Sequence, residues 1–188
     1  TFSSNIARLK SAVEFGKKLN RKVVILGRSM VKYIGAAENL ELVKLSKDAE
    51  IIGFGGQRRR KLQEIDRDRG KYLVITTGSQ GEPGSVLDKI VTKQLPFTFK
   101  ERDMVVFSCR TIPVPMNVAN RNNLDSVLKS QKVRIFTDIH ASVLPTTQVV
   151  INNSKSMRIK AISEISEGEK IKVPAFDSNA KIKWHNAR

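Results

Sequence analysis

The sequence holds a single cysteine and no long hydrophobic run. Because a disulfide or a cysteine-cluster metal site needs at least two cysteines, the lone Cys109 excludes both within the chain. A transmembrane helix would need about 20 consecutive apolar residues, and no such stretch occurs. The first residues also lack the pattern of a secretory signal peptide. These absences predict a soluble, cytoplasmic protein without a membrane partner.

Negative charge is scarce as well, because 34 Lys and Arg residues stand against 18 Asp and Glu residues, for a formal net charge of +16. Like charges at this density repel one another unless a polyanion neutralises them, and nucleic acid is the leading candidate. Residues 142–188 carry 8 basic and 4 acidic residues, so a net charge of +12 remains for residues 1–141. We therefore expect the first part of the chain to bind the polyanion.

Residues 1–141 alternate between helix-like and strand-like segments. Apolar residues at helical spacing predict helices, and short β-branched runs that end in turn residues predict buried strands. The expected helices cover residues 1–20, 29–45, 83–93 and 115–130, and the expected strands cover residues 21–27, 50–54, 71–76, 103–108 and 132–137. This alternation predicts an α/β fold with a mostly parallel, doubly wound sheet.

The pattern changes at residue 142. Residues 142–188 contain short β-type runs that alternate at period two, with turn signals at residues 152–153, 167–168 and 177–178 and no good helix. We therefore predict two domains, an α/β domain at residues 1–141 and a small all-β segment at residues 142–188.

Ligands of a doubly wound sheet bind beyond the carboxyl ends of its strands. We call the loops at those ends, residues 27–30, 77–83, 108–115 and 138–141, the rim loops. The glycines and hydroxyls of TTGSQGEP suit a phosphate, although an ordinary strand-to-helix turn explains this stretch equally well. Arg28 and Ser29 suit a charge-assisted phosphate contact, with a solvated arginine beside a helix cap as the alternative.

Two further features have open interpretations. The basic run QRRRK at residues 57–61 is either a solvated face or a track for a nucleic-acid backbone. His140 follows the last strand, where a lone histidine is more often a hydrogen-bonded structural residue than a ligand, and Asp138 is placed to orient it.

Four segments in this order, TFSSNIARL, VVILGRSM, LVITTGSQGEP and VRIFTDIHA, resemble signatures of the β-CASP domain of ribonuclease J, particularly of the archaeal type. They span almost all of residues 1–141. The resemblance implies a metal-dependent hydrolase with 5′-to-3′ exonuclease and endonuclease activity on RNA. It places two zinc ions in a metallo-β-lactamase domain of the same protein, outside this chain, where water between the metals is the nucleophile. Members of this family often form dimers.

The resemblance also assigns residues. It implies that the loop at residues 77–81 lines an RNA channel and that the loop with Arg28 and Ser29 lies near the RNA. It also implies that His140 begins a phosphate-binding motif, which this sequence does not complete. The implied RNA or phosphate contacts are Thr77, Gly78, Ser79, Gln80, Gly81, Arg28, Ser29 and His140. With His140 and His185 as its only histidines, the chain lacks a zinc cluster. We expect it to bind no metal cofactor and, alone, not to hydrolyse RNA.

Residues from 142 onward, SVLPTTQVVI followed by AISEISEGEKIKVPAFD and KIKWHN, resemble the amino-terminal splicing block of an intein. The resemblance makes Ser142 the nucleophile that attacks the carbonyl of Ala141, and Thr147 a residue that positions the junction. Residues 1–141 would then be the segment that precedes the intein, and residues 142–188 a truncated intein.

Two alternative functions stay open. The chain is a protein-splicing precursor half that performs acyl transfer at Ser142, or it is a basic α/β nucleic-acid-binding module without catalysis whose β-subdomain packs on the sheet.

Overall fold

The computed structural model describes residues 1–137 of the 188-residue chain, and these belong to the compact unit Thr1–His140. The predicted all-β segment at residues 142–188 and the predicted boundary after residue 141 lie outside the described residues. Among residues 1–137, no helix is both long and apolar enough to cross a membrane.

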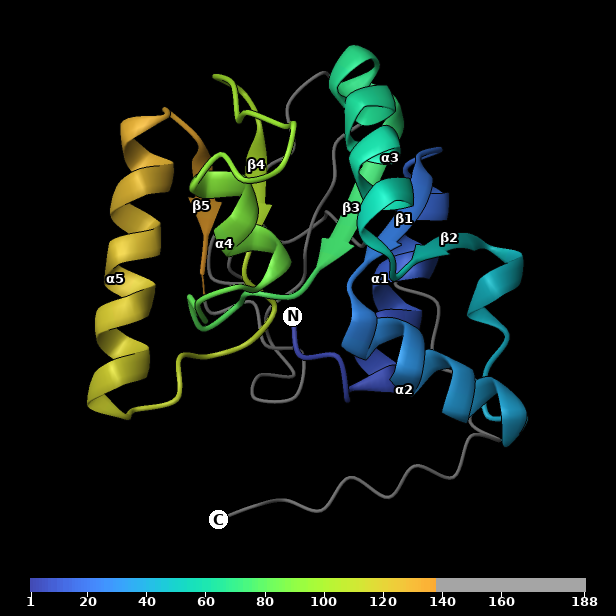
Figure 1. Cartoon of the computed structure of the whole chain (residues 1–188). Coiled ribbons are helices and arrows are strands. Elements are labelled where there is room, and N and C mark those ends of the chain that lie inside the picture. The colour runs from blue at the N-terminus through green and yellow to red at the C-terminus, as the bar shows by residue number, and fades with distance from the viewer. Residues whose placement is uncertain (138–188) are drawn as a thin grey trace, which may run out of the picture. The chain divides into compact units, whose positions relative to one another are not determined.

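Strands and helices alternate along the described residues (Figure 1). The strands are β1 (Lys22–Leu26), β2 (Ala49–Ile52), β3 (Tyr72–Thr76), β4 (Met104–Val106) and β5 (Arg134–Phe136). The helices are α1 (Ile6–Lys18), α2 (Arg28–Asn39), α3 (Gly55–Arg67), α4 (Val86–Val91) and α5 (Pro115–Ser130), with short 3-10 helices η1 (Leu45–Lys47) and η2 (Arg69–Lys71).

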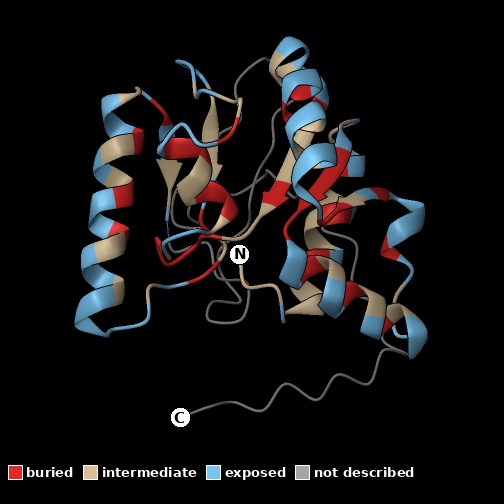
Figure 2. Ribbon diagram, viewed as in Figure 1, coloured by how far each residue is buried: buried red, intermediate tan, exposed pale blue. Residues whose placement is uncertain are grey.

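Alternate residues of β1 point to opposite faces, and helices cover both. Val23 and Ile25 lie in one core cluster with residues of α1 and α2, whereas Val24 and Leu26 lie in a second cluster with residues of α3 and α4. The buried residues of Figure 2 accordingly lie on the strands of the β2-β1-β3 sheet and on the inner sides of the helices. The predicted α/β class with parallel strands is confirmed for the described residues.

The strands form two parallel sheets instead of the one sheet that the sequence predicts. β1 lies between β2 and β3, with Val24 opposite Glu50 and Val74, and β4 pairs with β5, with Val105 opposite Ile135. Within residues 1–137, no backbone ladder joins β3 to β4. The prediction of one continuous sheet is therefore wrong for the described residues, because side chains join its two halves where backbone pairing was expected.

Helix α4 belongs to the cores of both sheets. Val86 and Ile90 pack into the cluster of the β2-β1-β3 sheet, whereas Leu87 and Val91 pack with residues of α5 into the cluster of the β4-β5 sheet. All four side chains are buried, and burial of one such side chain contributes about 1.5–3 kcal/mol. One short helix therefore holds both sheets through its two neighbouring faces.

Two helices differ from the sequence prediction. α2 ends at Asn39 and not near residue 45, because the chain turns at Glu41, whose φ is 55°. α3 occupies the basic segment for which the sequence predicted no element. Its helical pattern is weak because Leu62 and Ile65 are its only buried residues.

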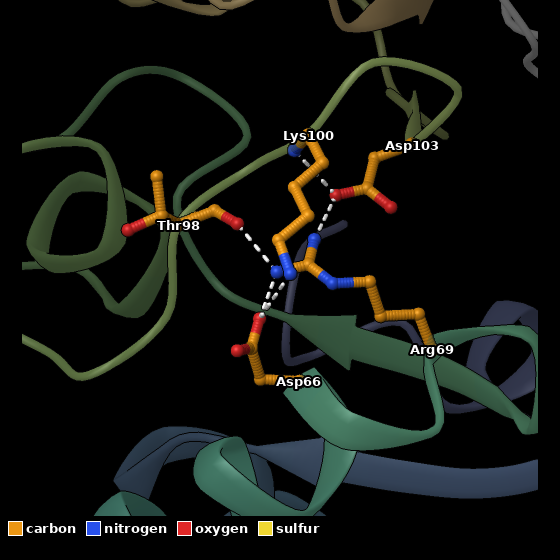
Figure 3. Close-up of polar contacts among 5 residues, drawn as sticks. All are labelled: Asp66, Arg69, Thr98, Lys100 and Asp103. Carbon is orange, nitrogen blue, oxygen red and sulfur yellow. Dashed lines mark hydrogen bonds and ion pairs between the residues drawn. The ribbon is translucent and has the colours of Figure 1, made fainter.

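Arg69 joins the amino ends of β3 and β4 (Figure 3). Its guanidinium pairs with the carboxylates of Asp66, in α3, and Asp103, just before β4, and donates a hydrogen bond to the Thr98 carbonyl at 2.6 Å. The backbone N–H of Lys100 donates to Asp103 at 2.9 Å. Only 17% of the Arg69 side chain is exposed, so these contacts replace water at the junction of the two sheets.

We expect Arg69→Met to lower the free energy of unfolding by about 1–3 kcal/mol, because the two carboxylates lose a partly buried partner. The matched control is Lys71→Met, which removes an exposed ion pair with Asp68 and should change stability by less than about 0.5 kcal/mol. Urea unfolding of the full chain measures both. Equal effects of the two substitutions would contradict a special role of Arg69.

Candidate nucleic-acid interface

The rim loops after β1 and β3 contact each other. Gly27 follows β1 with a φ of 147°, and a Cβ at this residue would lie 3.2 Å from Cγ2 of Thr77. The chain leaves β1 toward β2 on one side and later enters β3 on the other, so this contact lies at the topological switch point of the sheet. Ligands of parallel sheets characteristically bind beyond such a point.

Arg28 and Ser29 are exposed in the first turn of α2. The N-cap residue Gly27 provides no side-chain hydrogen bond, so it leaves the first N–H groups of the helix without a side-chain acceptor. Among residues 1–137, the Arg28 side chain has no hydrogen-bond or ion-pair partner. A free guanidinium beside the amino end of a helix is suited to an anionic group.

Residues 78–81 of the next rim loop are buried instead. The φ values of Gly78 and Gly81 are 113° and 73°. A Cβ at Gly78 would lie 2.7 Å from Cβ of Leu87, and a Cβ at Gly81 would lie 2.5 Å from the backbone of Asn120. These glycines therefore allow the loop to pack against α4 and α5.

The amide group of the Gln80 side chain forms its hydrogen bonds within the protein. Its Nε2 donates to the Arg110 carbonyl at 2.9 Å and lies 3.7 Å from Sγ of Cys109, while its Oε1 accepts from the backbone N–H of Ile112 at 2.8 Å. Only 2% of Gln80 is exposed. This residue therefore joins the loop after β3 to the loop after β4.

Arg121 of α5 reaches the same loop from the other side. Its Nη1 donates to the Ser79 carbonyl at 3.1 Å, and its Nε donates to Asp125 at 2.8 Å. The guanidinium carbon lies 3.3 Å from the centre of the Phe107 ring, a cation–π arrangement. Arg121 is buried, so its charge stabilises the rim from inside and does not face an external ligand.

Thr77 begins α4. Its hydroxyl accepts from the backbone N–H of Val86 at 3.3 Å, and its carbonyl accepts from the N–H of Leu87 at 3.2 Å. All five residues of the predicted channel loop, 77–81, thus make contacts that hold the strand-to-helix turn. Direct contact of these residues with RNA stays a prediction.

The basic run at residues 57–61, whose role the sequence left open, lies in the first half of α3, and sequence reasoning missed the aromatic residue that precedes it. Burial lowers the pKa of the Arg58 guanidinium, and the positive charges of Arg28 and Arg59 lower this pKa further. The first turns of α2 and α3, which follow the neighbouring strands β1 and β2, therefore carry cations that repel one another. Phe54, just before α3, is 72% exposed; in the sequence it is the last apolar residue of an expected strand.

His140, Ser142 and Thr147 lie outside the described residues, so their phosphate contact and splicing roles stay predictions. Within residues 1–137, no group of three or more His, Cys, Asp or Glu residues is placed to hold a metal ion. The described residues therefore do not fit a zinc site.

Comparison with known proteins gives a consistent family. Residues 1–127 match the family described as Ribonuclease J, beta-CASP domain. The chain is 45% identical over 143 residues to ribonuclease J of Methanocaldococcus jannaschii, which covers 76% of this chain and 32% of that protein.

Two further relatives are also ribonuclease J proteins. The one from Pyrococcus abyssi is 39% identical over 142 residues, which cover 76% of this chain and 31% of that protein. The one from Sinorhizobium meliloti is 36% identical over 149 residues, with 76% and 24% covered. The chain thus spans about a third or less of the length of these relatives.

Gly81 and Gly84 provide a test of the packing of the buried loop. Both have left-handed φ values, 73° and 74°, but no atom lies within 4 Å of a Cβ built at Gly84. We expect Gly84→Ala to lower the free energy of unfolding by about 1 kcal/mol through backbone strain alone. Gly81→Ala should lower it by about 1–3 kcal/mol more, because its Cβ meets the α5 backbone.

Urea unfolding of the two variants measures this difference. If Gly81→Ala were no more destabilising than Gly84→Ala, the close packing of the loop on α5 would be contradicted.

Proposed function

This chain belongs to the ribonuclease J family through its β-CASP domain, and on that premise we propose that the exposed part of its rim holds the phosphates of single-stranded RNA for a nuclease. The complete protein would be a zinc-dependent RNA 5′-to-3′ exonuclease and endonuclease. As the family resemblance implies, its metals would lie in a metallo-β-lactamase domain, and residues 1–137 offer no zinc site.

One observation carries the proposal. Arg28 and Arg58 lie in the first turns of α2 and α3, which follow the neighbouring strands β1 and β2, and neither side chain has a carboxylate partner among residues 1–137. After the larger effect of burial, the positive charge of Arg28 also lowers the pKa of Arg58. Neighbouring guanidiniums repel one another, so an anion that binds between them relieves this repulsion. Phosphate is the anion that an arginine fork and a helix amino end recognise best.

The difference in burial between the rim loops supports the same site. Residues 78–81 hold the rim together from inside, whereas Arg28 and Ser29 are exposed at the switch point. The role of this chain is therefore to bind and orient RNA. The chemical step of hydrolysis would belong to the zinc domain.

A second function, protein splicing, concerns residues 142–188. It is supported by the intein-like motif that starts at Ser142 and by the extent of the family match, which ends at residue 127. Each of the three relatives above likewise matches 76% of this chain and leaves the rest unmatched. In this proposal the Ser142 hydroxyl attacks the Ala141 carbonyl, the peptide C–N bond breaks, and an ester forms as the Ser142 amine is released.

The splicing proposal has a direct test. Hydroxylamine should cleave this ester and release a fragment of residues 1–141, which mass spectrometry detects, whereas Ser142→Ala should stay intact because it has no nucleophile. A wild-type chain that stays intact under the same conditions would contradict acyl transfer in this chain.

RNA binding should weaken steeply as salt rises, because each phosphate contact releases bound counterions. We expect Arg28→Gln to weaken binding of a single-stranded RNA oligonucleotide and to reduce the slope of log affinity against log salt by about 0.7–1. Fluorescence anisotropy across a salt series measures both values.

The matched control is Lys129→Gln, which removes one exposed positive charge from the last turn of α5, at the opposite end of the strands. It should leave the slope nearly unchanged. Wild-type affinity that does not respond to salt would refute the phosphate-binding proposal.

A further inference from the structure

Phe54 is exposed to an unusual degree for a large apolar side chain. It is 72% exposed, and among residues 1–137 the only other exposed aromatic residue is Tyr33, at 46%. An exposed phenylalanine contributes little to the core, because the hydrophobic effect rewards burial. Its place at the carboxyl end of β2 puts it on the edge of the sheet where ligands bind.

The backbone around Phe54 links it to the arginine pair. Its carbonyl accepts a hydrogen bond from the backbone N–H of Arg58 at 3.0 Å, so Phe54 caps the helix that carries Arg58. The preceding Gly53 packs on the first turn of α2, since a Cβ at Gly53 would lie 3.0 Å from Cγ2 of Val31. The segment from Gly53 to Arg58 therefore connects the first turn of α2, which carries Arg28, to the first turn of α3.

The first turn of α3 is also open to a ligand. No atom lies within 4 Å of a Cβ built at Gly55 or Gly56, and the helix has no side-chain cap. Arg58 adds a second observation, because its Nε is buried without a hydrogen-bond partner in the described part of the chain. Polar atoms in such a position are normally paired.

We propose that Phe54 is a base-stacking platform, on which an unpaired RNA base lies while the adjoining phosphate sits between Arg28 and Arg58. This inference rests on the proposed function and adds a base contact to it. The chemistry favours single-stranded nucleic acid over a folded acidic partner, because an isolated aromatic face beside paired cations matches a base and its phosphate. Every base has a π-face, so the contact tolerates different sequences.

The experiment uses the full chain with two ligands, a labelled ten-nucleotide oligoadenylate and an inorganic polyphosphate of similar charge. Phe54→Ala should weaken oligoadenylate binding about tenfold at every salt concentration and leave the salt slope unchanged. Polyphosphate, which has no bases, should bind the variant and the wild type equally. Phe54→Trp should restore the affinity for oligoadenylate.

Leu40→Ala is the matched control, because Leu40 is an equally exposed apolar residue, at 71%, on a different segment. It should bind both ligands as the wild type does. A 2-aminopurine in the RNA adds a readout of stacking itself. Its fluorescence should fall on binding to the wild type and fall much less on binding to Phe54→Ala.

The outcomes separate the two proposals. Salt-dependent wild-type binding that Phe54→Ala leaves unchanged would overturn the stacking platform and keep the phosphate site. Equal loss of oligoadenylate and polyphosphate binding in Phe54→Ala would also overturn it, since stacking acts on bases alone. A wild-type chain that binds neither ligand would overturn the proposed function and this inference together.

Discussion

Side chains, and not a backbone ladder, join the β2-β1-β3 sheet to the β4-β5 sheet in the described part of the chain. Arg69 joins the amino ends of β3 and β4 through Asp66 and Asp103, and Gln80 joins the loops at their carboxyl ends. A backbone ladder is made by every residue type except proline, whereas these contacts need an arginine and an amide at particular positions. The relative placement of the two sheets therefore depends on a few side chains and on the shared helix α4.

Because side chains must join the two sheets, residues 78–81 of the rim motif TTGSQGEP are buried. TTGSQGEP lies where the two sheets meet, so its glycines allow close packing on α4 and α5 and its Gln80 satisfies three polar neighbours. A polar side chain that is completely hydrogen-bonded inside the protein has little capacity left for a ligand. Exposed cations lie instead on α2 and α3, whose first turns flank the end of the β2-β1-β3 sheet, and at Arg110 in the loop after β4.

The sequence predicts the elements better than their assembly. Strand β1 and helix α5 follow from local patterns, because a β-branched run or a Pro at the first helical position is visible in a few residues. The break between β3 and β4 and the burial of Gln80 depend on partners 30 or more residues away, which no local pattern contains. Arg28 was assigned to the rim because it follows a clear strand. The run that contains Arg58 stayed open, and Phe54 was missed, because α3 has too few buried residues to show its period.

The same contacts limit what a loss of RNA binding can reveal about individual residues. Gly27 rests on Thr77, and the Thr77 hydroxyl holds the start of α4, so a change within residues 77–81 is transmitted to the turn that carries Arg28. A substitution of Gln80 that weakens RNA binding would therefore not by itself identify Gln80 as an RNA contact. A direct contact changes affinity without changing stability, whereas a contact that acts through the junction changes both. Unfolding and binding must be measured on the same variants before a rim residue is assigned to either role.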